Sequence, residues 1–93
     1  MRIFITGGLG FIGSNYILNK VTDPSIKILN YDKVTYAANL KNLSSIKNKS
    51  NYNFIKGDIS DFKKIMSLFQ DFKPDIVINF AAESHVDRSI DSP

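Results

Sequence analysis

The sequence contains no cysteine, no long apolar run and no export signal. Without cysteine the chain has neither a disulfide framework nor a thiolate metal site, and we predict no metal site of any kind. No apolar run approaches the length that crosses a bilayer, so we expect no membrane partner. The N-terminus reads MRIFITGG, which is too short and too early for a signal-peptide core. We therefore expect a cytoplasmic protein.

The net charge of the chain is also small. The 93 residues carry a net charge of +3, and the pI is about 9.2. A basic domain could bind nucleic acid, but here the lysines are scattered, and only Lys41, Lys47 and Lys49 gather in one polar stretch. We interpret them as solvated surface and expect no nucleic-acid partner.

Apolar runs alternate with helical patterns along the chain. Residues 2–6, 26–31, 52–55 and 75–81 read as strands, the last one so apolar that it resembles a buried parallel strand. Residues 11–21 carry a helical apolar stripe of Phe11, Ile12, Ile17, Leu18 and Val21, and a short helix is expected near 39–46. Residues 58–72 give the clearest helix pattern.

The helix expected over 58–72 has a cap and an apolar face. Ser60 or Asp61 can cap its start. Its stripe, at spacing i, i+3, i+4 and i+7, consists of Phe62, Ile65, Met66 and Phe69.

The order of these patterns predicts an α/β fold with a parallel sheet. Right-handed crossovers leave few topologies, and we predict the strand order 3-2-1-4 of an incomplete, doubly wound, Rossmann-type sheet. We expect residues 1–93 to be the N-terminal part of an NAD(P)-binding domain, whose catalytic and substrate-binding parts are absent. The fourth strand would then expose an unpaired edge and an uncovered face.

A glycine-rich loop follows the first strand. Gly8, Gly10 and Gly13 form G-x-G-x-x-G, while Gly7, Gly10 and Gly13 form G-x-x-G-x-x-G. Such glycines permit a tight turn, allow the backbone to approach a pyrophosphate, and let the helix pack closely on the strand. A glycine motif alone is weak, but this one follows a strand pattern and opens a helix pattern. We therefore predict a dinucleotide-phosphate site at the helix start.

An acidic residue ends the second strand pattern. Asp32 stands at the position where a carboxylate binds the adenosine ribose in dinucleotide folds. A carboxylate there repels a 2′-phosphate, so NAD is favoured over NADP. The alternative for Asp32 taken alone is a helix cap or a turn residue.

Several segments resemble the extended short-chain dehydrogenases/reductases, an NAD-dependent superfamily of nucleotide-sugar epimerases and dehydratases. The resemblance lies in GGLGFIGS at 7–14, YDKVTYAANLKNL at 31–43, GDI at 57–59 and FAAESHVDRSI at 80–90. The last segment is similar to the 4,6-dehydratases in particular. Phe80 and Ala38 depart mildly from the pattern, where leucine and glycine are commoner.

The resemblance implies an NAD site and a nucleotide-sugar substrate, in an enzyme that is a homodimer at full length. Phe11 and Ile12 would bind the pyrophosphate, Asp32 the ribose, and Asp58 the adenine, while Ser84 would face the sugar nucleotide. The implied cofactor residues are Gly7, Gly10, Phe11, Ile12, Gly13, Asp32, Lys33, Val34, Thr35, Asp58, Ile59, Phe80, Ala81, Ala82, Glu83 and Ser84.

Some of these residues have plainer interpretations. Asp58 could instead be the N-cap of the following helix, and both roles are compatible. We interpret His85 as a structural histidine, and Asp87 and Arg88 as a local pair without a catalytic role. The spacing Y-x-x-x-K occurs twice, at Tyr16 and at Tyr52, and we take both occurrences as coincidence.

The resemblance also implies a reaction. NAD would oxidise the sugar at carbon 4, water would be eliminated across carbons 5 and 6, and the hydride would return at carbon 6. The catalytic tyrosine, lysine and acidic pair lie beyond position 93 in that family, so we assign no catalytic residue. Two alternatives stay open, the cofactor half of an epimerase and a non-catalytic NAD-binding module. The downstream gene sequence separates them.

Overall fold

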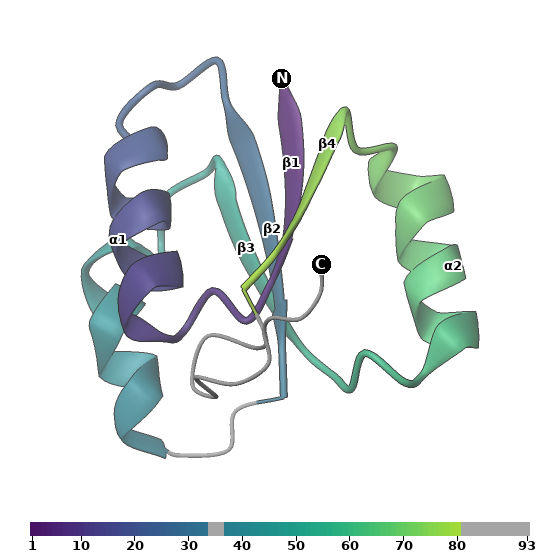
Figure 1. Cartoon of the computed structure of the whole chain (residues 1–93). Helices are drawn as coiled ribbons and strands as arrows, with labels where there is room; N and C mark the ends of the chain where they lie inside the picture. The colour runs from purple at the N-terminus through teal and green to yellow at the C-terminus, as the bar shows by residue number, and fades with distance from the viewer. Residues whose placement is uncertain (34–36, 81–93) are drawn as a thin grey trace.

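The computed structural model describes residues 1–33 and 37–80 (Figure 1). Its strands are β1 (Arg2–Thr6), β2 (Lys27–Asp32), β3 (Tyr52–Lys56) and β4 (Ile76–Asn79). They form a parallel sheet in the order β3-β2-β1-β4. The predicted α/β class and the strand order 3-2-1-4 are therefore confirmed.

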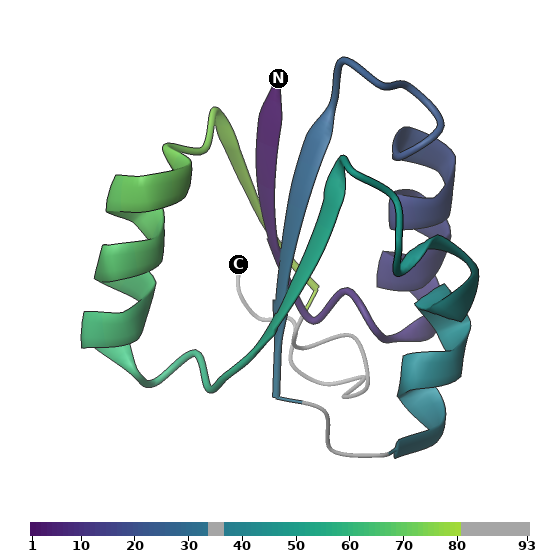
Figure 2. The ribbon, with the colours of Figure 1, turned by 180° about the vertical axis from the view of Figure 1, so that it is seen from behind.

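Helices cover both faces of the sheet (Figures 1 and 2). Helix α1 (Phe11–Lys20) and the 3-10 helix η1 (Ala37–Ile46) lie on one face, and α2 (Phe62–Phe72) lies on the other. The expected short helix near 39–46 corresponds to η1, which is kinked at Leu43. Successive side chains of each strand point to opposite faces of the sheet, so the strands contribute residues to two cores, one on each face.

The core on the α1 face is the larger one. It contains Ile3 and Ile5 of β1, Ile28 of β2 and Ile17 of α1, all at most 1% exposed. Phe11 and Ile12, expected in the buried stripe of this helix, are 78% and 57% exposed. They stand at the helix start, beyond the sheet surface that the later turns cover.

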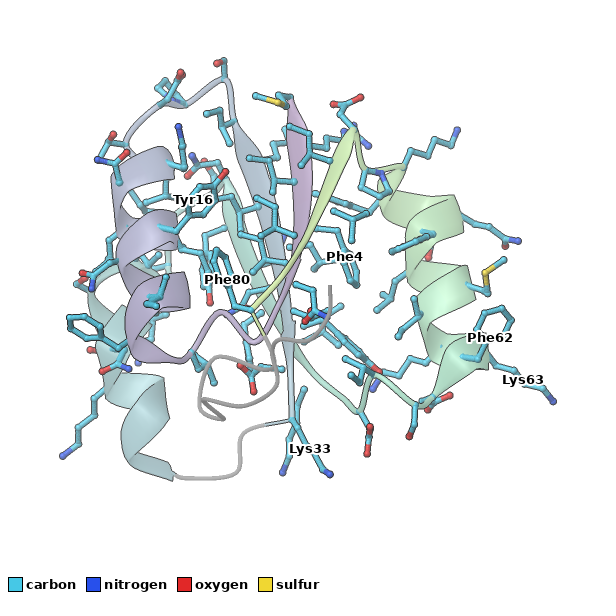
Figure 3. The ribbon with its side chains drawn as sticks, in the orientation of Figure 1. Phe4, Tyr16, Lys33, Phe62, Lys63 and Phe80 are labelled. Carbon is cyan, nitrogen blue, oxygen red and sulfur yellow. The ribbon has the colours of Figure 1, made fainter. Side chains whose placement is uncertain are left out.

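The core on the α2 face centres on Phe4, whose ring meets Phe69 edge to face at 4.9 Å. The helix begins at Phe62 rather than at 58, and the side chain of its N-cap, Asp61, accepts a hydrogen bond from the Lys64 N–H. The predicted stripe is confirmed at Ile65 and Phe69, which pack on the core together with Leu68 and Phe72. It is wrong at Phe62 and Met66, which are 70% and 41% exposed, so the apolar face is rotated from the predicted one. Figure 3 shows Phe62 pointing away from the sheet.

Strand β4 lies at the edge of the described sheet and pairs with β1. Ile76 and Val77 are 40% and 53% exposed. The segment forms the predicted parallel strand, and the expected exposed apolar surface is present on its described residues.

Candidate functional site

The carboxyl ends of the four parallel strands meet at one edge of the sheet, the lower edge in Figure 1. The glycine loop, Asp32 and Asp58 follow or end strands β1, β2 and β3 at this edge. Ligands of open α/β sheets bind at this kind of edge. The local geometry of each segment therefore decides what the edge can bind.

The turn out of β1 requires glycine at one position. Gly7 has a φ of 73°, in the left-handed region that favours glycine. Its N–H donates to the Tyr31 carbonyl, and its own carbonyl accepts from the Gly10 N–H, both at 3.3 Å. The turn reverses the chain from β1 into α1 within four residues.

The start of α1 suits an anion. Its N-cap is Gly10, which offers no side-chain oxygen to the helix, and its first turn carries no acidic residue. The N–H groups of a first helical turn have no partner within the helix and carry the positive end of the helix dipole. Phe11 and Ile12, predicted to bind a pyrophosphate through their N–H groups, lie in this first turn.

Gly13 lets α1 approach the loop closely. A Cβ atom at this position would lie 2.8 Å from the Gly7 carbonyl oxygen and 2.8 Å from the Gly8 Cα. Backbone atoms cannot move aside as a flexible side chain can. The role predicted for Gly13 was close packing of the helix on the strand, and the contacts show close packing on the loop that follows the strand.

Two polar side chains bind the loop at Leu9. The Asp32 carboxylate accepts a hydrogen bond from the Leu9 N–H at 3.1 Å, and the Asn42 amide donates to the Leu9 carbonyl at 2.7 Å. The Leu9 side chain is 2% exposed and belongs to the core. The loop is thus fixed by the end of β2, by η1 and by the core together.

Asp58 follows β3 and faces Lys33 at the end of β2. Their charged atoms are 3.4 Å apart, and both side chains are largely solvated, so the pair itself stabilises little. The Ser60 N–H, followed by its hydroxyl and by Lys33, holds the pKa of Asp58 below its ordinary value. The N-cap of α2 is Asp61, so the alternative role of Asp58 as that cap is wrong. Ile59, next in the chain, is 53% exposed.

Phe80 lies just beyond β4. Its N–H donates to the Thr6 carbonyl at 2.7 Å, and its ring contacts the Tyr16 ring of α1 at 5.7 Å between centroids (Figure 3). The contact places Phe80, the first residue of the predicted cofactor segment, on the α1 face of the sheet. Val34, Thr35, Ala81, Ala82, Glu83, Ser84 and His85 lie outside the described residues.

Neither Y-x-x-x-K spacing forms a tyrosine–lysine pair suited to catalysis. The Lys20 ammonium lies over the Tyr16 ring, 5.7 Å from its centroid, in a helix whose Tyr16 packs against Phe80. The Tyr52 hydroxyl accepts a hydrogen bond from the Asn30 amide inside the core. Lys56, four residues along the same strand, is about 13 Å from Tyr52 at the rise of an extended chain.

The sequence patterns missed residues that support the site. Asn30 bonds the loop, Asn42 bonds Leu9, and the Tyr31 hydroxyl donates to the Asp58 carbonyl at 2.8 Å. Burial, and then the charges of Asp61 and Asp58, raise the pKa of Tyr31. The one available signal was a polar residue, Asn30, inside an otherwise apolar strand.

A separate cavity of about 360 Å³ lies between η1 and β3. Its lining is mainly apolar, and of the loop residues it reaches Leu9 alone: the walls are Leu9, Lys41, Leu43, Ser44, Lys47, Tyr52 and Phe54. It is distinct from the predicted phosphate site at the start of α1. Within residues 1–33 and 37–80, we find neither a cluster of metal-ligating side chains nor a helix long and apolar enough to cross a membrane.

The sheet order and the loop geometry are those of a Rossmann-type fold. A family model described as GDP-mannose 4,6 dehydratase matches residues 4–93. The chain therefore belongs to this family of nucleotide-sugar dehydratases, as the resemblance of its motifs implied.

Individual relatives agree with the family. The chain is 52% identical over 89 residues to the human dTDP-D-glucose 4,6-dehydratase, covering 95% of this chain and 25% of that protein. It is 40% identical to the Bacillus anthracis dTDP-glucose 4,6-dehydratase, solved in complex with NAD, with a TM-score of 0.84 over 90% of this chain and 27% of that one. A Bacillus cereus UDP-glucuronic acid 4-epimerase, solved with NAD, is 26% identical, with a TM-score of 0.76 over 86% of this chain and 27% of that one. The chain spans about a quarter of the length of the curated relatives it matches.

Proposed function

We propose that these residues are the NAD-binding portion of a dTDP-glucose 4,6-dehydratase. The observation that carries the proposal is the pairing of an open helix start with a carboxylate at the end of the next strand. The first fits a pyrophosphate, and the second fits a ribose diol. The family match and the NAD complexes of similar proteins support it.

The residues present fit NAD at each group of its adenosine half. Gly8 and Gly13 keep the loop packed closely on its support, and Gly10, the N-cap, places no Cβ between the helix start and a phosphate. Asp32 already accepts the Leu9 N–H, and the two oxygens of a carboxylate offer about four acceptor sites, enough for a ribose hydroxyl as well. Lys33 and Asp58 stand at the rim where the adenine would lie.

NAD, when bound, supplies a hydride acceptor and donor, and the chain's own residues bind and orient it. The α1 N-terminus attracts the pyrophosphate, and Asp32 fixes the ribose and disfavours a 2′-phosphate. Residues 81–84 would continue beneath the cofactor, with Ser84 facing the nucleotide sugar. We also propose that residues 1–93 alone are inactive, because neither Tyr16 nor Tyr52 is placed as a base.

The dehydratase is favoured over the epimerase by similarity. Identity reaches 52% with a dehydratase sequence, against 26% with the epimerase structure. A homodimer in the cytoplasm, as the motif resemblance implies, belongs to the same proposal.

Assay of the protein to which these residues belong tests the proposed function. The protein is incubated with NAD and dTDP-glucose, and the product is identified by mass and by NMR. We expect a dTDP-4-keto-6-deoxy sugar. Epimerisation of a sugar nucleotide without loss of water would instead establish the epimerase, and NAD binding without turnover of any sugar nucleotide would establish the non-catalytic module.

A further inference from the structure

Asn30 is a fully buried amide in the middle of the sheet. It lies in β2, is 0% exposed, and follows Ile28 on the face that packs against α1. Burying an amide without hydrogen bonds is costly, so a buried asparagine must find partners. Its partners identify what this side chain does.

One partner of Asn30 is the glycine loop. The Gly8 N–H donates to Asn30 Oδ1 at 3.1 Å, so the loop rests directly on this amide. A Cβ atom at Gly8 would lie 2.4 Å from the same oxygen. Gly8 is therefore a glycine because Asn30 and Ile17 lie beneath it, and the Gly8 N–H rests the loop on the Asn30 amide.

The other partner holds the amide from β3. Asn30 Nδ2 donates to the Tyr52 hydroxyl at 3.1 Å, and Tyr52 is 5% exposed. A flipped amide would place its NH₂ group against the Gly8 N–H, two donors facing one another. The Gly8 N–H, which can only donate, therefore selects the orientation that presents an oxygen to the loop, and the Tyr52 hydroxyl holds the amide there by accepting from Nδ2. These contacts connect the loop after β1 to β2 and β3, and the three strands are neighbours in the sheet (Figure 2).

We propose that Asn30, held by Tyr52, is a positioning residue that sets the glycine loop for a pyrophosphate. The inference rests on the proposed NAD site and deepens it. Gly8 is two residues before Gly10, the N-cap of α1, so a shift at Gly8 moves the first N–H groups of the helix. Neither Asn30 nor Tyr52 needs to touch the cofactor.

If the role of Asn30 were merely structural, its substitution would lower stability and affect ADP and adenosine binding alike. Asn51 provides the matched control, since its amide donates to the carbonyls of Val21 and Ile26 at 2.9 and 3.0 Å. These bonds lie at the opposite end of α1, and a helix of ten residues is about 15 Å long. Asn51→Leu removes amide hydrogen bonds that are partly buried, whereas Asn30→Leu removes fully buried ones, and Asn51→Leu leaves the loop in place.

The test measures ADP and adenosine binding by calorimetry to the full-length protein and to both variants. ADP carries the pyrophosphate, and adenosine lacks it. We expect Asn30→Leu to weaken ADP binding about tenfold, the effect of one misplaced hydrogen-bonding group, and to leave adenosine within about twofold. Asn51→Leu should leave both affinities within about twofold while lowering the unfolding temperature.

Tyr52→Phe keeps the test valid if Asn30→Leu does not fold, because it removes one oxygen and preserves the ring. It removes the hydroxyl that holds the Asn30 amide in place, and we expect ADP binding to weaken about threefold with adenosine unchanged. Equal losses of ADP and adenosine in the folded variants, or no loss of ADP, would overturn the positioning role. A wild-type protein that binds neither ADP nor NAD would refute the proposed function and this inference with it. Normal wild-type binding with the wrong variant pattern would refute the inference alone.

Discussion

The carboxylate of Asp32, at the end of β2, accepts a hydrogen bond from the Leu9 N–H at 3.1 Å. One side chain thus has two tasks in the proposed site, to fix the glycine loop and to bind the ribose. The two tasks depend on different properties. Fixing the loop needs an acceptor oxygen, whereas disfavouring a 2′-phosphate needs a negative charge.

Substitutions at Asp32 should separate these tasks. Asp32→Asn keeps an acceptor for Leu9 and removes the charge, so we expect the preference for NAD over NADP to fall by about tenfold while the loop stays in place. Asp32→Ala removes both, and binding of either cofactor should weaken. Dissociation constants for NAD and NADP provide the measurement. Equal affinity for both cofactors in the unaltered protein would contradict the role of Asp32.

Two loop glycines should respond differently to alanine. A Cβ at Gly13 meets backbone at 2.8 Å, so Gly13→Ala should destabilise the fold by about 1–3 kcal/mol through overpacking. Gly10 has φ −70°, which any residue adopts, so Gly10→Ala should weaken NAD binding more than it lowers stability. Thermal unfolding and NAD titration of both variants test the contrast. A Gly10→Ala protein that loses fold and binding together would refute it.

Truncation of Phe69 and of Phe62, both on α2, should lower stability to very different extents. Phe69 packs edge to face on Phe4, and we expect Phe69→Ala to lower the free energy of unfolding by about 2–3 kcal/mol. Phe62 is 70% exposed, so Phe62→Ala should change it by less than about 0.5 kcal/mol. Denaturant unfolding of the pair measures both. Similar losses of unfolding free energy at the two positions would mean that Phe62 packs on the core, as the sequence pattern predicted.

Tyr31 should make the fold sensitive to alkali. Burial, then the charges of Asp61 and Asp58, raise its pKa in the folded state above the ordinary value of about 10. As pH rises past 10 or so, the unfolded chain loses this proton first, so stability is complete below that pH and falls as pH rises through the folded pKa. Unfolding midpoints from about pH 8 to pH 11 should drop less steeply in Tyr31→Phe than in the unaltered protein. Identical slopes would show that Tyr31 ionises as readily in the fold as in the unfolded chain.

The sheet and the loop were predictable from sequence because their signals are local. Apolar strand patterns alternate with helix patterns, and right-handed crossovers then fix the neighbours. Glycine spacing with an acid at the next strand end indicates one kind of site. These rules use residues near one another along the chain.

The phase of α2 and the support of the loop were not predictable in the same way. The sets Phe62, Ile65, Met66, Phe69 and Ile65, Leu68, Phe69, Phe72 have the same helical spacing, so sequence cannot choose between them. The contact with Phe4 decides. Asn30 contacts Gly8 and Tyr52, each 22 residues away, and a lone asparagine in a strand does not reveal such partners.

A crystal structure of the full-length protein with NAD tests the central claim most directly. The account predicts pyrophosphate oxygens within hydrogen-bond distance of the Phe11 and Ile12 N–H groups, and a ribose hydroxyl on the Asp32 carboxylate. The Leu9 N–H should still donate to Asp32. NAD bound elsewhere, or a pyrophosphate away from the start of α1, would contradict the account.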